Sequence, residues 1–362
     1  MHFSSATARR QRGITLVEMM VAMVVGLILL VGIVQLFVSN KQAYRIQEGA
    51  NVLNENARYM LNKLQYDLRM ADHWGGVEAE NITIDDDVDD IEGDCDGAAA
   101  ALQIAGIYGV DGDDASPLDC IPDADYVPGT DIVVVRYAEP IRRASGTLDV
   151  GSNEDRFFLR VFVSASGIVL QGKKNLADLS PDELKPANAS ATTVEEEADA
   201  EEADEDSPLT NYQLRTYVYF LRPCASQARG TAGECDEEDD NIPTLTRLSL
   251  EGTTLVQQDI ISGVEQMQFA YGVDDNGDRS PDRYLSADDV TGADAWNKII
   301  DVKMSVLIRN NEIDTTASDT STYQLYGGDD GGSVAYTVPA DARMYRRKLF
   351  NSSIQIRNMT RG

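Results

Sequence analysis

The stretch Arg9-Arg10-Gln11-Arg12-Gly13-Ile14-Thr15-Leu16-Val17-Glu18 decides how this chain is organised. Three arginines end at Gly13, and an apolar run then continues to Val38, interrupted by one charged residue, Glu18. As a helix, the run from Ile14 to Val38 is about 37 Å long. It can therefore cross a bilayer core of about 30 Å with some tilt. A secretory signal would have a shorter apolar core and a small-residue cleavage site, so the stretch predicts a membrane-spanning helix.

The charges around this helix predict its orientation and raise a question about Glu18. Residues 1–13 contain arginines and no acids, and positive charge stays on the cytoplasmic side. The chain from about Ser39 onward is therefore expected in the periplasm or outside the cell. A carboxylate inside an apolar helix is costly in lipid and needs a partner. The alternative is a plain single-pass anchor in which Glu18 reaches the nearby interface.

The residues Gly13-Ile14-Thr15-Leu16-Val17-Glu18 resemble the class III signal of type IV pilins and pseudopilins. The resemblance implies that a prepilin peptidase cleaves between Gly13 and Ile14 and that the new N-terminus is methylated. It also makes Glu18 the glutamate at the fifth mature position. Ile14 departs from the phenylalanine or methionine that is more usual there. Cleavage would place an ammonium group at Ile14, which can neutralise the Glu18 carboxylate of a neighbouring subunit in a stack of parallel helices.

The chain is strongly acidic, with 61 acidic and 31 basic residues and a formal net charge of −30. A surface of this charge disfavours nucleic acid and anionic lipid surfaces as direct partners. The excess of acid is consistent with salty surroundings, in which long-range repulsion is screened.

Four cysteines lie beyond the membrane span, on the side where disulfides persist: Cys95, Cys120, Cys224 and Cys235. Four cysteines allow three pairings. Pairing of nearest neighbours, Cys95 with Cys120 and Cys224 with Cys235, is the one that we expect. Metal binding is the alternative, but the spacings lack the C-x-x-C signature of zinc sites.

The helix is predicted to continue past the membrane. Apolar residues recur at steps of three and four after Val38, while polar residues, including Asp67, occupy the other face; the apolar positions are Ile46, Ala50, Leu53, Ala57, Met60, Leu61, Leu64 and Leu68. No proline occurs between Ile14 and Val77. One helix is therefore expected from about Ile14 to Met70, ended by His73-Trp74-Gly75-Gly76.

A β-rich head is predicted after the helix. Residues 77–128, rich in Asp, Gly and Pro, are expected to be loop with short strands. The later runs of β-branched and aromatic residues predict strands: Asp131–Tyr137, Phe157–Val163, Tyr212–Leu221, Leu245–Leu250, Val264–Tyr271, Ile299–Ile308 and Lys348–Arg357. The fold class is α+β, a long helix packed on an antiparallel sheet. The expected parts are a leader at 1–13, the apolar helix at 14–38, its amphipathic continuation at 39–76 and a head at 77–362.

Three acidic runs are separate features: Asp85–Asp96, Glu195–Asp206 and Glu234–Asp240. Runs of this kind usually stay solvated, and about 179–208 is expected to be a disordered loop inserted between two strands. Charge density alone supplies no fixed geometry for calcium.

One segment has a regular spacing of oxygen side chains: Asp274, Asn276, Asp278, Ser280 and Asp282. Calcium needs six to eight oxygens, often from one tight loop, and the spacing resembles the first half of an EF-hand loop. It departs in having Arg279 at the sixth position, Leu285 at the twelfth, and no helical flanks. The alternative is a plain hairpin turn of type I′ at Asn276-Gly277.

Signatures of enzymes are scarce. The chain has two histidines, His2 in the expected leader and His73 at the expected helix end. A Ser-His-Asp site would depend on His73 alone, and no P-loop, G-x-S-x-G, G-x-G-x-x-G or H-E-x-x-H occurs. We therefore expect a substrate of the prepilin peptidase, not an enzyme.

Within the pilins, the chain resembles large minor pilins of the PilW family. The resemblance is carried by Gly13 to Leu36, by Asn54-Glu55-Asn56-Ala57-Arg58 and its continuation, and by Phe269 to Tyr284. It implies a subunit that primes pilus assembly and sits in a tip complex. The implied partners are other minor and major pilins, the inner-membrane assembly platform and a tip adhesin. The chain would wait in the inner membrane before moving to the fibre tip.

Two other interpretations stay open at this point. One is a minor pseudopilin, the J-type subunit of a type II secretion system, since the N-terminal signal does not separate the two. The other is an anchored extracellular binding protein or hydrolase that keeps its leader. Gene neighbours would separate the first two, and the mass of the mature N-terminus would separate the third.

Overall fold

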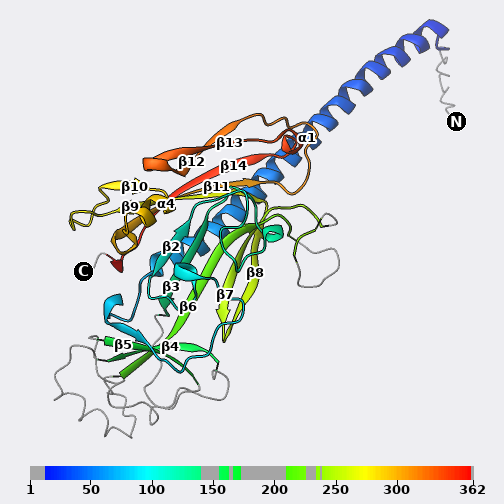
Figure 1. Cartoon of the computed structure of the whole chain (residues 1–362). Coiled ribbons are helices and arrows are strands. Elements are labelled where there is room, and N and C mark those ends of the chain that lie inside the picture. The colour runs from blue at the N-terminus through cyan, green and yellow to red at the C-terminus, as the bar shows by residue number, and fades with distance from the viewer. Residues whose placement is uncertain are drawn as a thin grey trace, which may run out of the picture. The chain divides into compact units, whose positions relative to one another are not determined.

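The computed structural model describes residues 13–139, 155–162, 166–172, 209–225, 234–236 and 239–359 (Figure 1). The chain divides into two compact units, Met1–Val52 and Leu53–Gly362, and each is described by itself. The expected leader at 1–13, apart from Gly13, and the expected loop at 179–208 lie outside the described residues. The predicted domain boundaries stay predictions.

The first element is one uninterrupted helix, α1, which runs from Leu16 to Met70. Its prediction as a single helix is confirmed. After it, Ala71 and His73 donate their N–H groups back to the carbonyls of Asp67 and Met70, and Asp72 takes a positive φ of 62°. The left-handed residue ends the helix because it turns the chain away from the helical path.

An eight-stranded sheet forms the larger part of the second unit. Its strands are β1 (Ile82–Ile84), β2 (Ile107–Val110), β3 (Ile132–Ala138), β4 (Phe157–Phe162), β5 (Ser166–Gln171), β6 (Leu209–Arg222), β7 (Thr244–Glu251) and β8 (Thr254–Ser262). The central strand is β6, which pairs with β3 along one edge and with β4 and then β7 along the other. Strands β5 and β1 continue outward from β4, β8 from β7 and β2 from β3.

A second sheet of four strands has the order β10-β9-β11-β14, and a separate hairpin is formed by β12 and β13. These elements are β9 (Val264–Val273), β10 (Arg283–Leu285), β11 (Ile299–Arg309), β12 (Thr322–Gly328), β13 (Gly332–Thr337), β14 (Arg347–Gln355) and the short helix α4 (Ala287–Gly292). Single turns of 3₁₀ helix complete the described part: η1 (Ala79–Asn81), η2 (Gly97–Ala99), η3 (Asp123–Asp125), η5 (Trp296–Lys298), η6 (Asp329–Gly331) and η7 (Ala340–Ala342).

The main core joins the end of α1 to both sheets. The helix contributes a buried stripe at steps of three and four, Leu53, Ala57, Met60, Leu64 and Leu68. These side chains pack with inward residues of β3 and β6 from the larger sheet and of β9 and β11 from the smaller one. The stripe exists because that spacing places one residue per turn on a single side of the helix.

The strand predictions agree well with the observed strands where the apolar signal is strong. Each of the seven predicted strands corresponds to an observed strand, and the ends differ by three residues or fewer in the described part of the chain. The interpretation of 77–128 as loop with short strands is also confirmed, since it contains β1 and β2. The α+β fold class is confirmed.

Two expectations about the head need correction. The sheet is not wholly antiparallel, because β1 pairs with β5 in parallel. The strands β5, β8, β10, β12 and β13 were not predicted. They are short, or polar residues and glycines interrupt their apolar pattern; β8, for example, contains Gln257-Gln258-Asp259. These strands form through pairing with a neighbour, which a local pattern does not record.

Candidate assembly site

The helix begins with a reciprocal capping arrangement between Thr15 and Glu18. The backbone N–H and the hydroxyl of Thr15 both donate to Oε2 of Glu18, at 3.0 and 2.9 Å, and the N–H of Glu18 donates to Oγ1 of Thr15 at 3.2 Å. This is the capping box, in which two otherwise unpaired helix N–H groups are satisfied. The Thr-x-x-Glu spacing is the sequence signal for it, and our sequence reasoning overlooked that signal.

The capping box uses only one carboxylate oxygen of Glu18. Within the described residues, Oε1 of Glu18 accepts no hydrogen bond. The neighbouring Ile14 side chain is 79% exposed. A carboxylate oxygen thus stays open one turn from the position at which the resemblance places the mature N-terminus. The predicted pairing of Glu18 with a neighbour's ammonium is compatible with the cap.

The helix segment after Glu18 is suited to an apolar environment. Among the described residues, α1 is the one helix that is long and apolar enough to cross a membrane, judged by length and composition. Its large apolar side chains between Ile14 and Val38 are all at least 50% exposed in the single chain. Lipid or other apolar helices must cover this surface, because water is a poor solvent for it.

In the head, the same helix is held by a buried carboxylate, Asp67. It is 0% exposed and accepts hydrogen bonds from the hydroxyls of Tyr137, at 2.8 Å, and Tyr219. Lys63 and Arg247 lie 3.7 and 3.8 Å from its Oδ2. Burial and the Asp67 charge raise the pKa of both tyrosines, so the hydroxyls stay protonated and donate. The assignment of Asp67 to the polar face was wrong.

The position of Asp67 follows from the helical period. It lies three residues after Leu64 and one before Leu68, which puts it on the edge of the buried stripe. The polar partners come from β3, β6 and β7, so the bonds fix the rotation of the helix against the sheet. Sequence alone did not identify these partners, which lie far along the chain.

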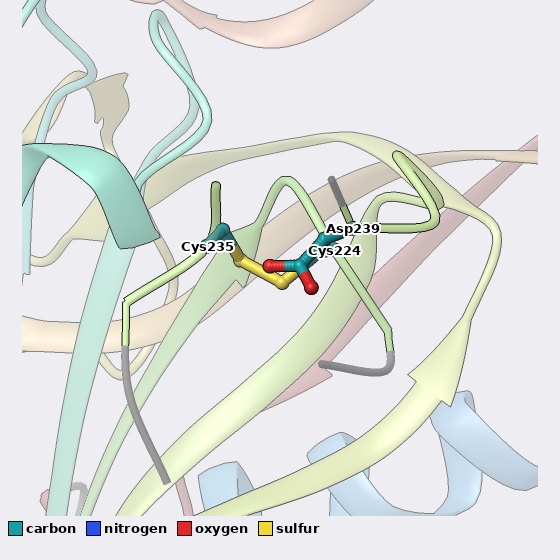
Figure 2. Close-up of side chains that lie close together, drawn as sticks. All are labelled: Cys224, Cys235 and Asp239. Atoms are coloured by element: carbon teal, nitrogen blue, oxygen red, sulfur yellow. A yellow bond between two sulfur atoms is a disulfide. The ribbon is translucent and has the colours of Figure 1, made fainter. Parts of the chain in front are cut away.

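The cysteines form two disulfides, Cys95–Cys120 and Cys224–Cys235, with Cα–Cα distances of 4.7 and 5.9 Å. Both join nearest neighbours, which is the predicted pairing. The carboxylate of Asp239 lies beside the second bond (Figure 2). In the described part of the chain, one group of three or more metal-ligating side chains has its ligand atoms within 4.8 Å of one another: Cys224, Cys235 and Asp239. Because the two sulfurs are bonded to each other, no thiolate is present to bind a metal.

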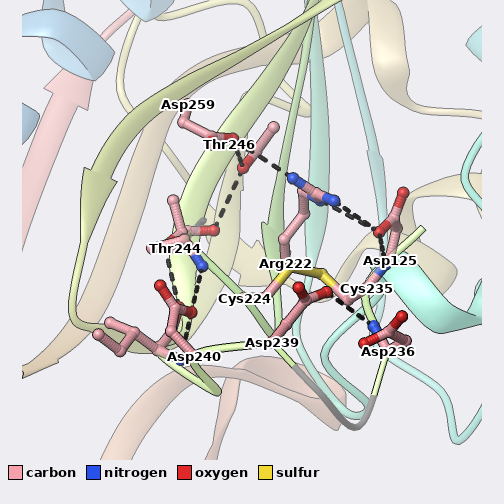
Figure 3. Close-up of a disulfide and its surroundings, with 12 residues drawn as sticks. Asp125, Arg222, Cys224, Cys235, Asp236, Asp239, Asp240, Thr244, Thr246 and Asp259 are labelled. Carbon is pink, nitrogen blue, oxygen red and sulfur yellow. Dashed lines mark hydrogen bonds and ion pairs between the residues drawn. A yellow bond between two sulfur atoms is a disulfide. The ribbon is translucent and has the colours of Figure 1, made fainter. Parts of the chain in front are cut away.

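The backbone of the second disulfide is hydrogen-bonded to a buried ion pair between Arg222 and Asp125. Arg222 donates to Oδ1 of Asp125 at 2.9 Å, and the same oxygen accepts the N–H of Cys235 at 2.9 Å (Figure 3). Arg222 also lies 3.8 Å from Asp259 of β8. The disulfide and Arg222 therefore both link the end of β6 to the turn η3 through Asp125, and Arg222 also links it to the edge strand β8.

The predicted calcium segment forms the loop between β9 and β10. Asp274 accepts the N–H groups of Gly277 and Arg279 at 2.7 and 2.8 Å, and Asp282 accepts those of Asp275 and the Asn276 amide. Asn276 and Asp278 each accept the N–H two residues later, from Asp278 and Ser280. All five predicted residues are thus in one loop. Backbone donors occupy several of its oxygens.

The plain type I′ turn is wrong for this loop. Such a turn needs positive φ at both central residues, whereas here the positive φ values are at Gly277 and Arg279, at 77° and 69°. The loop is longer than a two-residue turn, since β9 ends at Val273 and β10 begins at Arg283. Calcium binding stays a prediction.

Two family models match the chain. The model for Type IV Pilus-assembly protein W matches residues 230–358, and the model for the prokaryotic N-terminal methylation motif matches residues 8–34. The chain is a PilW-like type IV pilin. No curated protein matches it, and no solved structure does.

The two matched regions correspond to different parts of this PilW-like pilin. The methylation motif contains Gly13, Ile14 and Glu18, with the capping box and the first turns of α1. The PilW match contains β7 to β14, including the loop at Asp274–Asp282. The chain is therefore a minor pilin of the type IV pilus system with a membrane-anchoring N-terminal helix.

Proposed function

We propose that this pilin primes pilus assembly and then stays in a complex of minor pilins at the fibre tip. The observation that supports priming is the start of α1, where Glu18 caps its own helix with one oxygen and leaves Oε1 open. A positive N-terminus on an adjacent subunit fits that oxygen and would set the axial register between two helices.

The free energy of assembly would come from the apolar half of the helix. Its side chains leave lipid when the subunit enters the fibre, so an equivalent apolar surface must receive them. Parallel pilin helices supply that surface. The Glu18 pair then selects the register, because a carboxylate left unpaired among apolar helices is unfavourable.

The size of the second unit supports a place at the tip. It extends from Leu53 to Gly362 and contains two sheets and a separate hairpin. A head this large would crowd neighbours in a fibre shaft, whereas a tip position leaves space on one side. The PilW match also favours a pilus over a type II secretion pseudopilus.

The proposed partners are other minor and major pilins, the prepilin peptidase, the inner-membrane assembly platform and a tip adhesin. The N-terminus would be cytoplasmic before cleavage. We propose no catalytic activity for the chain. His73, the one histidine beyond the expected leader, lies just after α1, where its backbone N–H donates to the Met70 carbonyl and its carbonyl accepts the Ala138 N–H.

Processing and location can be tested in cells. Mass spectrometry of the protein from sheared fibres should show a methylated Ile14 as the first residue. Deletion of the gene should lower piliation, and an epitope tag at the C-terminus should label fibre ends. An intact Met1 would support the anchored-protein alternative, and uniform labelling along the shaft would contradict the tip location.

Calcium binding by the loop has a separate test. Millimolar calcium should raise the melting temperature of the purified protein, because the ion would tie β9 to β10 through the loop oxygens. The double variant Asp274→Ala, Asp278→Ala should lose this rise, and the exposed control Glu312→Ala should keep it. An equal melting temperature with and without calcium would contradict the prediction.

A further inference from the structure

The two sheets of the head are connected by a buried carboxylate, Asp131, which directly precedes β3. It is 2% exposed, and its backbone N–H donates to the carbonyl of Met267 in β9 at 3.0 Å. Its Oδ2 accepts the N–H of Phe269 in β9 at 2.7 Å. Its Oδ1 accepts the N–H of Gly112, just after β2, at 3.1 Å. One residue therefore links β2 and β3 of the larger sheet to β9 of the smaller sheet.

Other buried carboxylates of the head have a basic partner, whereas Asp131 does not. Three of them form ion pairs with arginines: Asp67 with Arg247, Asp125 with Arg222, and Glu265 with Arg347. Among the described residues, no basic side chain is paired with Asp131, and the charges that act on it are those of Asp111 and Asp288. A buried carboxylate without a positive partner is unfavourable in its charged form.

Further acids lie around Asp131 and come from separate segments. Asp111 follows β2, and its two oxygens accept the N–H groups of Ala287 and Asp288 at 2.8 and 2.9 Å, which links β2 to α4. Burial and neighbouring negative charges raise the pKa of Asp288; these charges belong to Asp111, Asp289, Asp329 and Asp113. We call these five acids with Asp131 the acidic junction. It joins β2, β3, α4 and η6 through groups of the same charge.

The other titratable groups at the acidic junction are the phenols of Tyr108, Tyr126 and Tyr271. Burial raises the pKa of Tyr126 to about 12 and raises the pKa of Tyr271 as well. These two phenols therefore stay neutral at neutral pH. The hydroxyl of Tyr271 is fully buried and has no hydrogen-bond partner among the described residues. It does not donate to Asp131, unlike the two tyrosine hydroxyls that donate to Asp67.

Burial and like charge act in the same direction on Asp131. Burial raises the pKa of Asp131 well above its ordinary value, and the charges of Asp111 and Asp288 raise it further. The N–H groups of Phe269 and Gly112 oppose this rise. The neutral acid is favoured because it avoids both the desolvated charge and the repulsion. It still accepts a hydrogen bond through its carbonyl oxygen.

We propose that Asp131 is a pH-sensitive link between the two sheets of the head, firm while its carboxyl group is protonated and loosened when it ionises beside Asp111 and Asp288. On ionisation the proton passes to solvent, and a negative charge stays inside the acidic junction. The hydrogen bonds from Gly112 and Phe269 end on this carboxylate. Opening of the link is therefore expected at these two N–H groups.

The direction of the pH dependence follows from the raised pKa in the folded state. The closed link holds a proton that an open, hydrated Asp131 releases above about pH 4. Stability from the link is therefore fully present below about pH 4 and is lost as the pH rises through the folded-state pKa. Over that interval the equilibrium constant for closing falls by up to about tenfold per pH unit.

The test is hydrogen exchange of the full chain in detergent, read by mass spectrometry and corrected for the intrinsic exchange rate. In the wild type, protection of the peptides that contain Gly112 and Phe269 should fall between about pH 5 and about pH 8. Asp288→Asn removes one like charge while the backbone bond to Asp111 stays, because the Asp288 side chain is exposed. This variant should match the wild type at about pH 5 and be about threefold or more better protected at about pH 8.

Two further variants complete the test. Asp341→Asn is the matched control, since Asp341 is an exposed acid in η7 whose charge is not among those that act on Asp131; it should keep the wild-type profile. Asp131→Asn should remove the pH dependence of both peptides, and Asp288→Asn decides the matter if that variant does not fold. Protection that does not change with pH in the wild type, or the same fall in Asp288→Asn, would overturn the proposal.

Discussion

The two halves of α1 belong to one helix, but their side chains lie in different environments. Between Ile14 and Val38, the large apolar side chains are at least 50% exposed in the single chain. Between Leu53 and Leu68, five apolar side chains are buried in the head, and Asp67 among them has hydrogen-bond partners from the sheet. The first half is completed by lipid or by other subunits, and the second half by its own chain.

The same contrast applies to the two acids. Glu18 at the start of the helix has one oxygen in a local cap and one open. Asp67 near the end of the helix accepts hydrogen bonds from two tyrosines and lies beside a lysine and an arginine. We therefore expect the first acid to affect assembly and the second to affect the stability of the folded head.

The largest expected effect is that of Glu18→Ala on assembly. Cells that carry this variant should show the piliation of the deletion strain, because we propose that the open oxygen of Glu18 pairs with the N-terminus of a neighbouring subunit. The melting temperature of the head should stay that of the wild type. Piliation counts and thermal unfolding of the purified protein measure the two. Normal piliation would break the proposed division between the halves.

The next largest effect is that of Asp67→Ala on stability. Removing the carboxylate leaves the hydroxyls of Tyr137 and Tyr219 without their acceptor and takes away the negative charge beside Arg247, which should cost about 3–5 kcal/mol. Denaturant unfolding measures this loss. Glu55→Ala, at an exposed position of the same helix, should change the free energy of unfolding little. An unchanged stability in Asp67→Ala would show that apolar packing alone holds the helix.

A smaller effect is expected just beyond the helix, at Asp72. Burial raises its pKa to about 6, although Trp74 and Gly106 donate to it and act in the opposite direction. Because the folded protein then holds a proton that the unfolded chain releases, stability should fall as the pH rises from about 4 to about 6. Asp72→Asn should remove this part of the pH dependence. Urea unfolding at several pH values measures it, and parallel pH profiles of the two proteins would contradict the prediction.

The smallest effect is that of Thr15→Val, which removes the hydroxyl of the capping box. Loss of such a cap typically costs about 1 kcal/mol. We expect faster hydrogen exchange confined to the first turn of α1 in detergent, with head stability and processing at Gly13 unchanged. Thr15→Ser, which keeps the hydroxyl, is the matched control. Equal exchange in the valine and serine variants would show that the cap does not hold this turn.

Much of the head could be predicted from sequence because its strands carry strong local patterns. The strands β3, β9 and β11 are rich in β-branched and aromatic residues, and each was placed within a few residues. Strand β8 was not, because its central Gln257-Gln258-Asp259 resembles a loop and its pairing with β7 is what makes it a strand.

The sites divide in the same manner. Gly13, Ile14 and Glu18 were predicted as processing and assembly residues from the resemblance of a local motif to the class III signal, and the disulfide pairing was predicted from the nearest-neighbour choice. The burial of Asp67 was not predicted, because it depends on residues far along the chain. The partners of Asp67 are at Tyr137, Tyr219 and Arg247.

The sequence by itself determined that an apolar helix with a single acid begins after Gly13, because hydrophobic period and charge are local properties of consecutive residues. It also determined the α+β class, since the period changes from that of a helix to that of strands. Only the tertiary structure decided which side of α1 packs against the sheets of the head and which polar groups form hydrogen bonds or ion pairs. Burial and hydrogen bonding between distant segments exist only once the chain has folded.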